Sequence, residues 1–217
     1  RRPFDPIPRV LSAKTFTNLE QGLIQRINAL NLFLNDIYHN RMILRDGKIP
    51  EEFVLSSLDF RTQCVGIMPP KGIYTHITAT DLVCSTDGNW YAMEDSLSVP
   101  DGATYPHFAR KLCREIAPEN YQVPGLCDNC GLDILLSQRD IIDDDPELEG
   151  GIVVLLSEGE NTLSHFELGY MAKLTGAVVA EAERLIVMDN KVYYRAPEGG
   201  FQRVAIIHRL TLDSMLD

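Results

Sequence analysis

A β-hairpin is predicted at residues 73–94, which read Ile73-Tyr74-Thr75-His76-Ile77-Thr78-Ala79-Thr80-Asp81-Leu82-Val83-Cys84-Ser85-Thr86-Asp87-Gly88-Asn89-Trp90-Tyr91-Ala92-Met93-Glu94. The segment 73–78 has the alternating side-chain pattern of a strand and is rich in β-branched residues. Residues 82–84 continue the predicted strand. Asp87-Gly88-Asn89 is a turn signal, after which 90–94 returns as the second strand. The pattern therefore predicts two antiparallel strands joined by a tight turn.

Two carboxylates lie on the arms of this hairpin, Asp81 ahead of the turn and Glu94 behind it. Cross-strand pairing can bring both together on one face. Magnesium takes one or two protein carboxylates and completes its octahedron with phosphate oxygens and water. The pair therefore predicts a magnesium and phosphate site, and the alternative is a solvated hairpin edge that binds nothing.

The charge balance of the chain excludes some classes of partner. Of 217 residues, 31 are acidic and 20 basic, which gives a net charge of −11. Nucleic acid and anionic membrane surfaces would lack an electrostatic driving force, whereas a bound cation could still attract an anionic substrate. No apolar stretch approaches the roughly 20 residues of a membrane span, and the N-terminus has no signal-peptide core. We expect a cytoplasmic protein.

The remaining elements are predicted from the spacing of apolar residues and from the residues that interrupt helices and strands. An apolar stripe predicts a helix over 19–37 with Thr17 as its N-cap, and 108–116 is also predicted helical. Six acids within 140–149 indicate a linker or surface loop. Beyond them the pattern is typical of a βαβ unit followed by further strands. The expected segments are strand 152–156, helix 163–174, strand 177–180, hairpin 185–194 and strand 204–207.

The five cysteines are an odd number, which favours free thiols in a reducing compartment. Cys127 and Cys130 form a lone C-x-x-C with no second pair. A small zinc-dependent binding module is one interpretation of this pair, and an ordinary loop with two thiols is the other.

The hairpin resembles the metal-binding hairpin of ATP-grasp ligases, including those similar to D-alanine:D-alanine ligase. The resemblance places Asp81 at the metal-binding aspartate, Glu94 at the glutamate that bridges two Mg2+ ions and Ser96 at an asparagine ligand. A hydroxyl is a weaker ligand than an amide carbonyl. Ala79 stands where the family usually has a basic residue.

The chain is still more similar to the circularly permuted ATP-grasp proteins, a group labelled glutathionylspermidine synthase-like. The motifs that carry this likeness are Pro3-Phe4-Asp5-Pro6-Ile7-Pro8-Arg9, Leu19-Glu20, Gly22-Leu23, Asp46-Gly47, Ile49-Pro50 and Gly72-Ile73-Tyr74. The implied fold class is α+β. A permuted ATP-grasp C-terminal subdomain with antiparallel sheet and helices occupies 1–125, an acidic linker 126–150, and a Rossmann-like α/β pre-ATP-grasp domain 151–217.

The resemblance implies ATP-dependent ligation of a carboxylate to an amine through an acylphosphate, with Mg2+ as cofactor. The substrates would be small-molecule or peptide acids and amines, and Arg9, Gly102 and Thr104 would bind them. Arg9 could equally form a structural salt bridge. The nucleotide-binding residues are expected beyond residue 217. The alternative function is a non-catalytic scaffold or interaction module that lacks the nucleotide-binding half.

Overall fold

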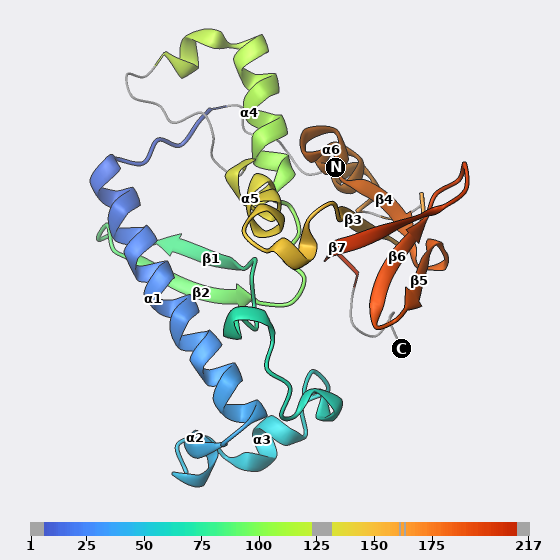
Figure 1. The fold of residues 1–217 in the computed structure, drawn as a ribbon. Coiled ribbons are helices and arrows are strands. Elements are labelled where there is room, and N and C mark those ends of the chain that lie inside the picture. Colours follow the sequence, from blue (N-terminus) through green and yellow to red (C-terminus); the bar gives the residue numbers. More distant parts are fainter. Residues whose placement is uncertain (1–6, 123–131, 161, 163, 212–217) are drawn as a thin grey trace. The chain divides into compact units, whose positions relative to one another are not determined.

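The chain folds into two compact units in the computed structural model, which describes residues 7–122, 132–160, 162 and 164–211 (Figure 1). Val10–Ser98 forms the hairpin unit, and the chain from Val99 onward, with the segment up to Arg9, forms the sheet unit. Among the described residues, no helix is long and apolar enough to cross a membrane.

The hairpin unit is built on the long helix α1 (Ala13–Tyr38). It begins at Ser12, whose hydroxyl accepts a hydrogen bond from the amide of Thr15 at 3.1 Å, so the prediction of Thr17 as N-cap was wrong. The C-terminal end of α1 packs on the short helices α2 (Met42–Arg45) and α3 (Glu51–Leu55). The buried side chains of this small core are Ile37, Leu44 and Val54. Two 3-10 turns follow, η1 (Thr62–Cys64) and η2 (Pro70–Gly72).

The predicted hairpin is confirmed as β1 (Ala79–Cys84) and β2 (Trp90–Ser96), which pair antiparallel. The strand predicted over 73–78 was wrong, because residues of α1 bind that segment directly. The Asn31 Oδ1 atom accepts from the backbone amides of Tyr74 at 2.9 Å and Thr75 at 3.1 Å. These amides therefore need no neighbouring strand.

The sheet unit opens with helix α4 (Thr104–Ile116). A five-stranded sheet has the order β4-β3-β7-β6-β5; β3 runs parallel to β4 and β7, and β6 antiparallel to β5 and β7. The strands are β3 (Ile152–Ser157), β4 (Val178–Glu181), β5 (Leu185–Met188), β6 (Lys191–Arg195) and β7 (Phe201–Arg209). The other elements are η3 (Pro118–Tyr121), α5 (Leu132–Asp143), η4 (Pro146–Leu148), α6 (His165–Thr175) and η5 (Ala182–Arg184).

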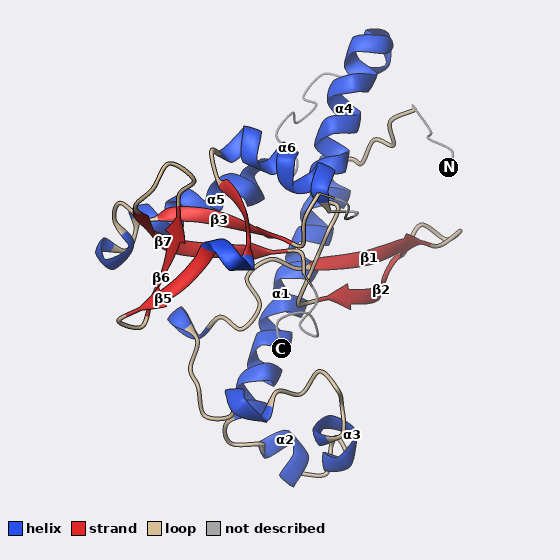
Figure 2. Ribbon diagram, turned by 90° about the vertical axis from the view of Figure 1, so that its right-hand side faces the viewer, coloured by secondary structure: helices blue, strands red, loops and turns tan. Residues whose placement is uncertain are grey.

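Helices α5 and α6 lie on one side of the sheet (Figure 2). Leu155 of β3 is buried there against Leu168 and Met171 of α6. The β3–α6–β4 connection confirms the predicted βαβ unit, and Gly176 ends α6 at φ +73°, a conformation that suits glycine. The opposite face of the sheet has its own core of Val154, Ala180, Tyr194, Ala196 and Val204. The assignment of this unit as Rossmann-like remains a prediction.

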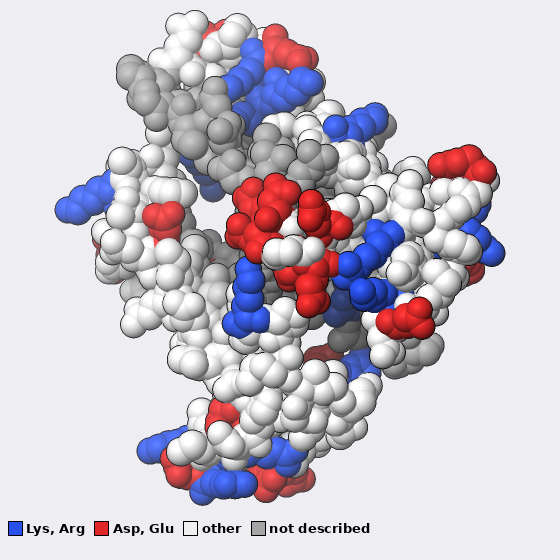
Figure 3. Space-filling view, viewed as in Figure 1, with Lys and Arg blue, Asp and Glu red and all other residues white. Residues whose placement is uncertain are grey.

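The acid-rich region that was predicted to be a linker contains α5 and η4. Acidic side chains gather on the surface where α5 ends (Figure 3). The boundary between the two compact units, at Ser98 and Val99, falls inside the predicted 1–125 domain. The division at residues 125 and 150 remains a prediction.

Candidate metal-binding hairpin

A β-bulge sets which acidic side chains face each other across the hairpin. From the turn outward, Leu82 pairs with Ala92, but the next pair is Asp81 with Glu94. Met93 is the extra residue, left without a cross-strand partner. Because directly paired residues project to the same face, Asp81 and Glu94 share one face of the hairpin.

Ser96 belongs to the same face, since it lies two residues beyond Glu94 on the same strand. We call this the outer face; it is opposite the face that meets α1. Asp81, Glu94 and Ser96 are all exposed. The structure thus places the three predicted metal ligands on one exposed surface, with Asp81 and Glu94 directly paired across the two strands.

The fit of magnesium to this surface follows from its donor set. Carboxylate and hydroxyl oxygens are hard ligands, and Mg2+ commonly uses one or two carboxylates with the rest of its shell from phosphate and water. Among the described residues no group of three or more His, Cys, Asp or Glu side chains could hold a metal ion by itself. Asp81, Glu94 and Ser96 thus supply oxygen donors of the kind that Mg2+ uses.

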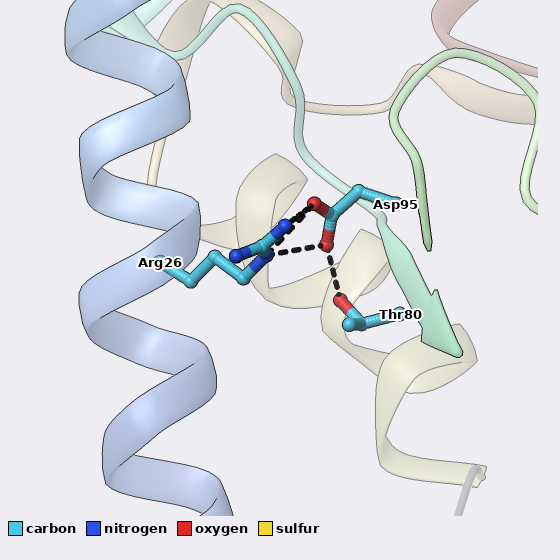
Figure 4. Close-up of polar contacts among 3 residues, drawn as sticks. All are labelled: Arg26, Thr80 and Asp95. Atoms are coloured by element: carbon cyan, nitrogen blue, oxygen red, sulfur yellow. Dashed lines mark hydrogen bonds and ion pairs between the residues drawn. The ribbon is translucent and has the colours of Figure 1, made fainter. Parts of the chain in front are cut away.

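Asp95, the neighbour of Glu94, projects to the opposite face and holds the hairpin on α1 (Figure 4). Its carboxylate accepts two hydrogen bonds from the Nε of Arg26, at 3.0 and 2.8 Å, and lies 2.7 Å from Arg26 Nη2. The Thr80 hydroxyl donates a third bond at 2.9 Å. These three side chains, Arg26, Thr80 and Asp95, form the helix clamp.

Electrostatics keep the helix clamp ionised. Hydrogen bonds from Arg26 hold the pKa of Asp95 below its ordinary value; burial opposes this effect, and the Thr80 hydroxyl and the guanidinium charge add to it. The same contacts raise the pKa of Arg26. The Asp95 side chain is 10% exposed and that of Arg26 44% exposed. The two consecutive acids of β2 therefore differ in role, because Asp95 is committed to a salt bridge and Glu94 is exposed.

A groove of about 530 Å³ runs between α1 and the inner face of the hairpin. Its walls include Leu19 and Leu23 of α1, and Leu82, Trp90 and Ala92 of the hairpin. Trp90, the single tryptophan of the chain, is half-buried in this groove. It therefore reports on how the hairpin packs against the helix.

The predicted substrate-binding residues Gly102 and Thr104 lie in the sheet unit, where a buried carboxylate contacts both. Glu167 of α6 accepts hydrogen bonds from the Gly102 amide at 2.9 Å, and from the amide and hydroxyl of Thr104 at 3.2 Å each. Arg9 is exposed and forms no ion pair with any residue of the described ranges. The Arg9 salt bridge considered above is therefore not seen there.

Sequence reasoning missed three of these residues: Arg26, Asp95 and Glu167. Arg26 lies outside the apolar stripe by which the helix was predicted. Asp95 is adjacent to Glu94, which was the residue that matched the metal-binding pattern. Cys127 and Cys130 lie outside the described residues, so the zinc interpretation stays a prediction. Of the described cysteines, Cys64 and Cys84 are exposed and Cys113 is buried.

Comparison with known proteins identifies a family across almost the whole chain. The family model described as circularly permuted ATP-grasp type 2 matches residues 8–217. An uncharacterized protein of Synechocystis sp. is 36% identical over 217 residues, which is 99% of this chain and 44% of that protein. An uncharacterized protein of Mycobacterium tuberculosis is 36% identical over 220 residues, or 99% of this chain and 39% of that protein.

A further relative carries an enzyme name. A protein of Frankia casuarinae named "Putative glutamate--cysteine ligase 2-2" is 34% identical over 211 residues, which is 95% of this chain but 24% of that protein. The chain spans less than half the length of these curated relatives.

Proposed function

The chain belongs to the circularly permuted ATP-grasp type 2 family, and from this we propose that it forms the Mg2+-binding part of an ATP-dependent carboxylate–amine ligase. The observation that carries the proposal is the pairing of Asp81 with Glu94 on the exposed outer face of the hairpin. In the proposed reaction a substrate carboxylate oxygen attacks the γ-phosphorus of ATP and ADP leaves. An amine nitrogen then attacks the acyl carbon of the acylphosphate, phosphate leaves, and the nitrogen releases a proton to give the amide.

We propose Asp81 and Glu94 as the protein ligands of the metal, with Ser96 contributing its hydroxyl. Bound there, Mg2+ would supply charge neutralisation for the transferring phosphoryl group. The helix clamp at Asp95 fixes β2 on α1, and it thereby limits the freedom of the neighbouring Glu94. Such fixed positioning of charged groups is the main requirement of phosphoryl transfer.

For the substrate side we propose Arg9 and the loop that carries Gly102 and Thr104, and we assign this loop to the amine substrate. The acids and amines would be small molecules or peptides. Arg9 is exposed, and a free guanidinium can grip a carboxylate through two hydrogen bonds. Glutamate and cysteine are the first pair to test, because the Frankia relative carries those names. An odd number of cysteines and a need for ATP both favour the cytoplasm as the location.

The test is the double variant Asp81→Asn/Glu94→Gln, compared with Asp59→Asn/Glu20→Gln, which changes two exposed acids of the same unit. Calorimetric titration with MgCl2 should show at least tenfold weaker binding for the first variant and no change for the second. Turnover of Mg-ATP by the intact enzyme should be lost only in the first. Far-UV circular dichroism checks that each variant folds.

Equal Mg2+ affinity and equal turnover in the wild type and in Asp81→Asn/Glu94→Gln would overturn the site assignment. Absence of Mg2+ binding and of ATP turnover in the wild type would instead favour the scaffold alternative.

A further inference from the structure

Glu167 is a buried carboxylate that has no cationic partner among the residues that the structure describes, which is unusual. Its side chain is 2% exposed. No lysine or arginine of the described residues forms an ion pair with it. Within the described ranges, its two oxygens accept three hydrogen bonds, and all three come from one short segment, Gly102 and Thr104. This arrangement, which we call the loop anchor, stabilises the carboxylate with oriented dipoles in place of a counter-charge.

The backbone around Gly102 explains why this segment binds an anion. Gly102 has φ +89°, and Ala103 that follows is right-handed helical with φ −58° and ψ −29°. Successive residues of opposite hand turn the amides of the first and third residues toward a common point, which forms an anion-binding nest. The amides of Gly102 and Thr104 are those two donors, and Glu167 receives both.

The loop anchor also completes the start of α4. The helix begins at Thr104, and its N-cap Ala103 has no side chain that can accept a hydrogen bond. Glu167 takes the place of a capping residue, from the first turn of α6. A carboxylate there also interacts favourably with the positive end of the α4 dipole. Helix α4 and the loop before it are therefore set by a residue 63 to 65 positions away along the chain.

We propose that Glu167 is a positioning residue of the ligase, which fixes the loop 100–104 on the amine side by the loop anchor. This inference rests on the proposed function, since it assigns Gly102 and Thr104 to the amine side. Thr104 is 1% exposed, and both its amide and its hydroxyl donate hydrogen bonds to Glu167. It therefore acts on the conformation of the loop from its buried side. The role of Glu167 in the reaction is thus indirect, through the conformation of residues 100–104.

The loop anchor is tested first by amide hydrogen exchange. Glu167→Gln keeps the size of the side chain, but its NH2 group must face one of the donors. Exchange at Gly102 and Thr104 should become about tenfold faster, whereas Glu198→Gln, an exposed control in the same unit, should change nothing. Thr104→Val, which removes only the hydroxyl, tests the same contact if Glu167→Gln fails to fold. Thr104→Ser should restore wild-type protection.

The positioning role is tested by kinetics of the intact enzyme, with glutamate and cysteine as the first substrates. Glu167→Gln and Thr104→Val should raise the KM for the amine substrate about tenfold and leave the KM for ATP within about twofold. Thr104→Ser should behave as wild type. An unchanged KM for the amine, with faster exchange at residues 102 and 104, would overturn the positioning role alone. A wild type that hydrolyses no ATP with any acid and amine would overturn the proposed function itself.

Discussion

Replacement of Asp95 by asparagine tests the helix clamp without changing the size of the side chain. Asparagine keeps one oxygen for Thr80 or Arg26 but loses the charge and one acceptor position. Hydrogen bonds to charged groups contribute about 1.5–3 kcal/mol, and solvent screening lowers this figure because the Arg26 side chain is 44% exposed. We therefore expect the free energy of unfolding to fall by about 1 kcal/mol, a change of about fivefold in the ratio of folded to unfolded protein.

The pH dependence of this difference follows from the lowered pKa of Asp95. A carboxyl whose pKa is lower in the folded state stabilises the protein above its unfolded pKa of about 3.9, and loses that effect as pH falls through the folded pKa. The difference in the free energy of unfolding between wild type and Asp95→Asn should thus have its full size at pH 7 and should disappear below pH 4. Urea titration followed by Trp90 fluorescence measures it, because Trp90 lies in the groove between the hairpin and α1.

Two controls make the measurement specific to the helix clamp. Asp59→Asn changes an exposed acid of the same unit and should not alter the unfolding midpoint. In a double-mutant cycle, the losses of unfolding free energy caused by Arg26→Gln and by Asp95→Asn should be less than additive, because either change removes the same ion pair. Additive effects, or a gap that is as large at pH 3 as at pH 7, would refute the reasoning.

Two further stability predictions concern packing and buried amides. Gly151→Ala would bring a new Cβ atom to 2.6 Å from Ala205 Cβ, so urea titration followed by circular dichroism should show a loss of about 1–3 kcal/mol; unchanged stability would contradict this packing. Asn31→Ala leaves the amides of Tyr74 and Thr75 without their acceptor, so the free energy of unfolding should fall by about 1–3 kcal/mol. Urea titration followed by Trp90 fluorescence measures this loss. A cost below the error of the titration would mean that water replaces the Asn31 oxygen.

Periodicity in the sequence predicted most of the regular elements. The apolar stripe of α1, the Asp87-Gly88 turn of the hairpin and the βαβ unit around α6 were all recognised, since each is a local pattern. The N-cap error at α1 was a local one, whereas the strand error came where a distant side chain replaced a neighbouring strand. Residues 73–78 have the composition of a strand, but Asn31 of α1 binds the amides of Tyr74 and Thr75.

The candidate site was predictable only in part, for a related reason. The sequence was enough to place Asp81 and Glu94 on the two arms of one hairpin. Their exact pairing depends on a bulge that no sequence pattern predicted. The contacts of Arg26 with Asp95 span 69 positions, and those of Glu167 span 63 to 65. Contacts of that separation depend on tertiary packing, which local propensity does not determine.

The bulge at Met93 has a consequence for searching distant sequences for this kind of site. Ala92 and Glu94 face consecutive residues of β1, Leu82 and Asp81, so residue 93 can be removed and a regular ladder remains. A homologue shorter by that one residue would carry its two acids twelve positions apart and still present them side by side. Search patterns that insist on one fixed interval between the acids would discard such sequences, whereas patterns that tolerate a single-residue gap on the second strand would keep them.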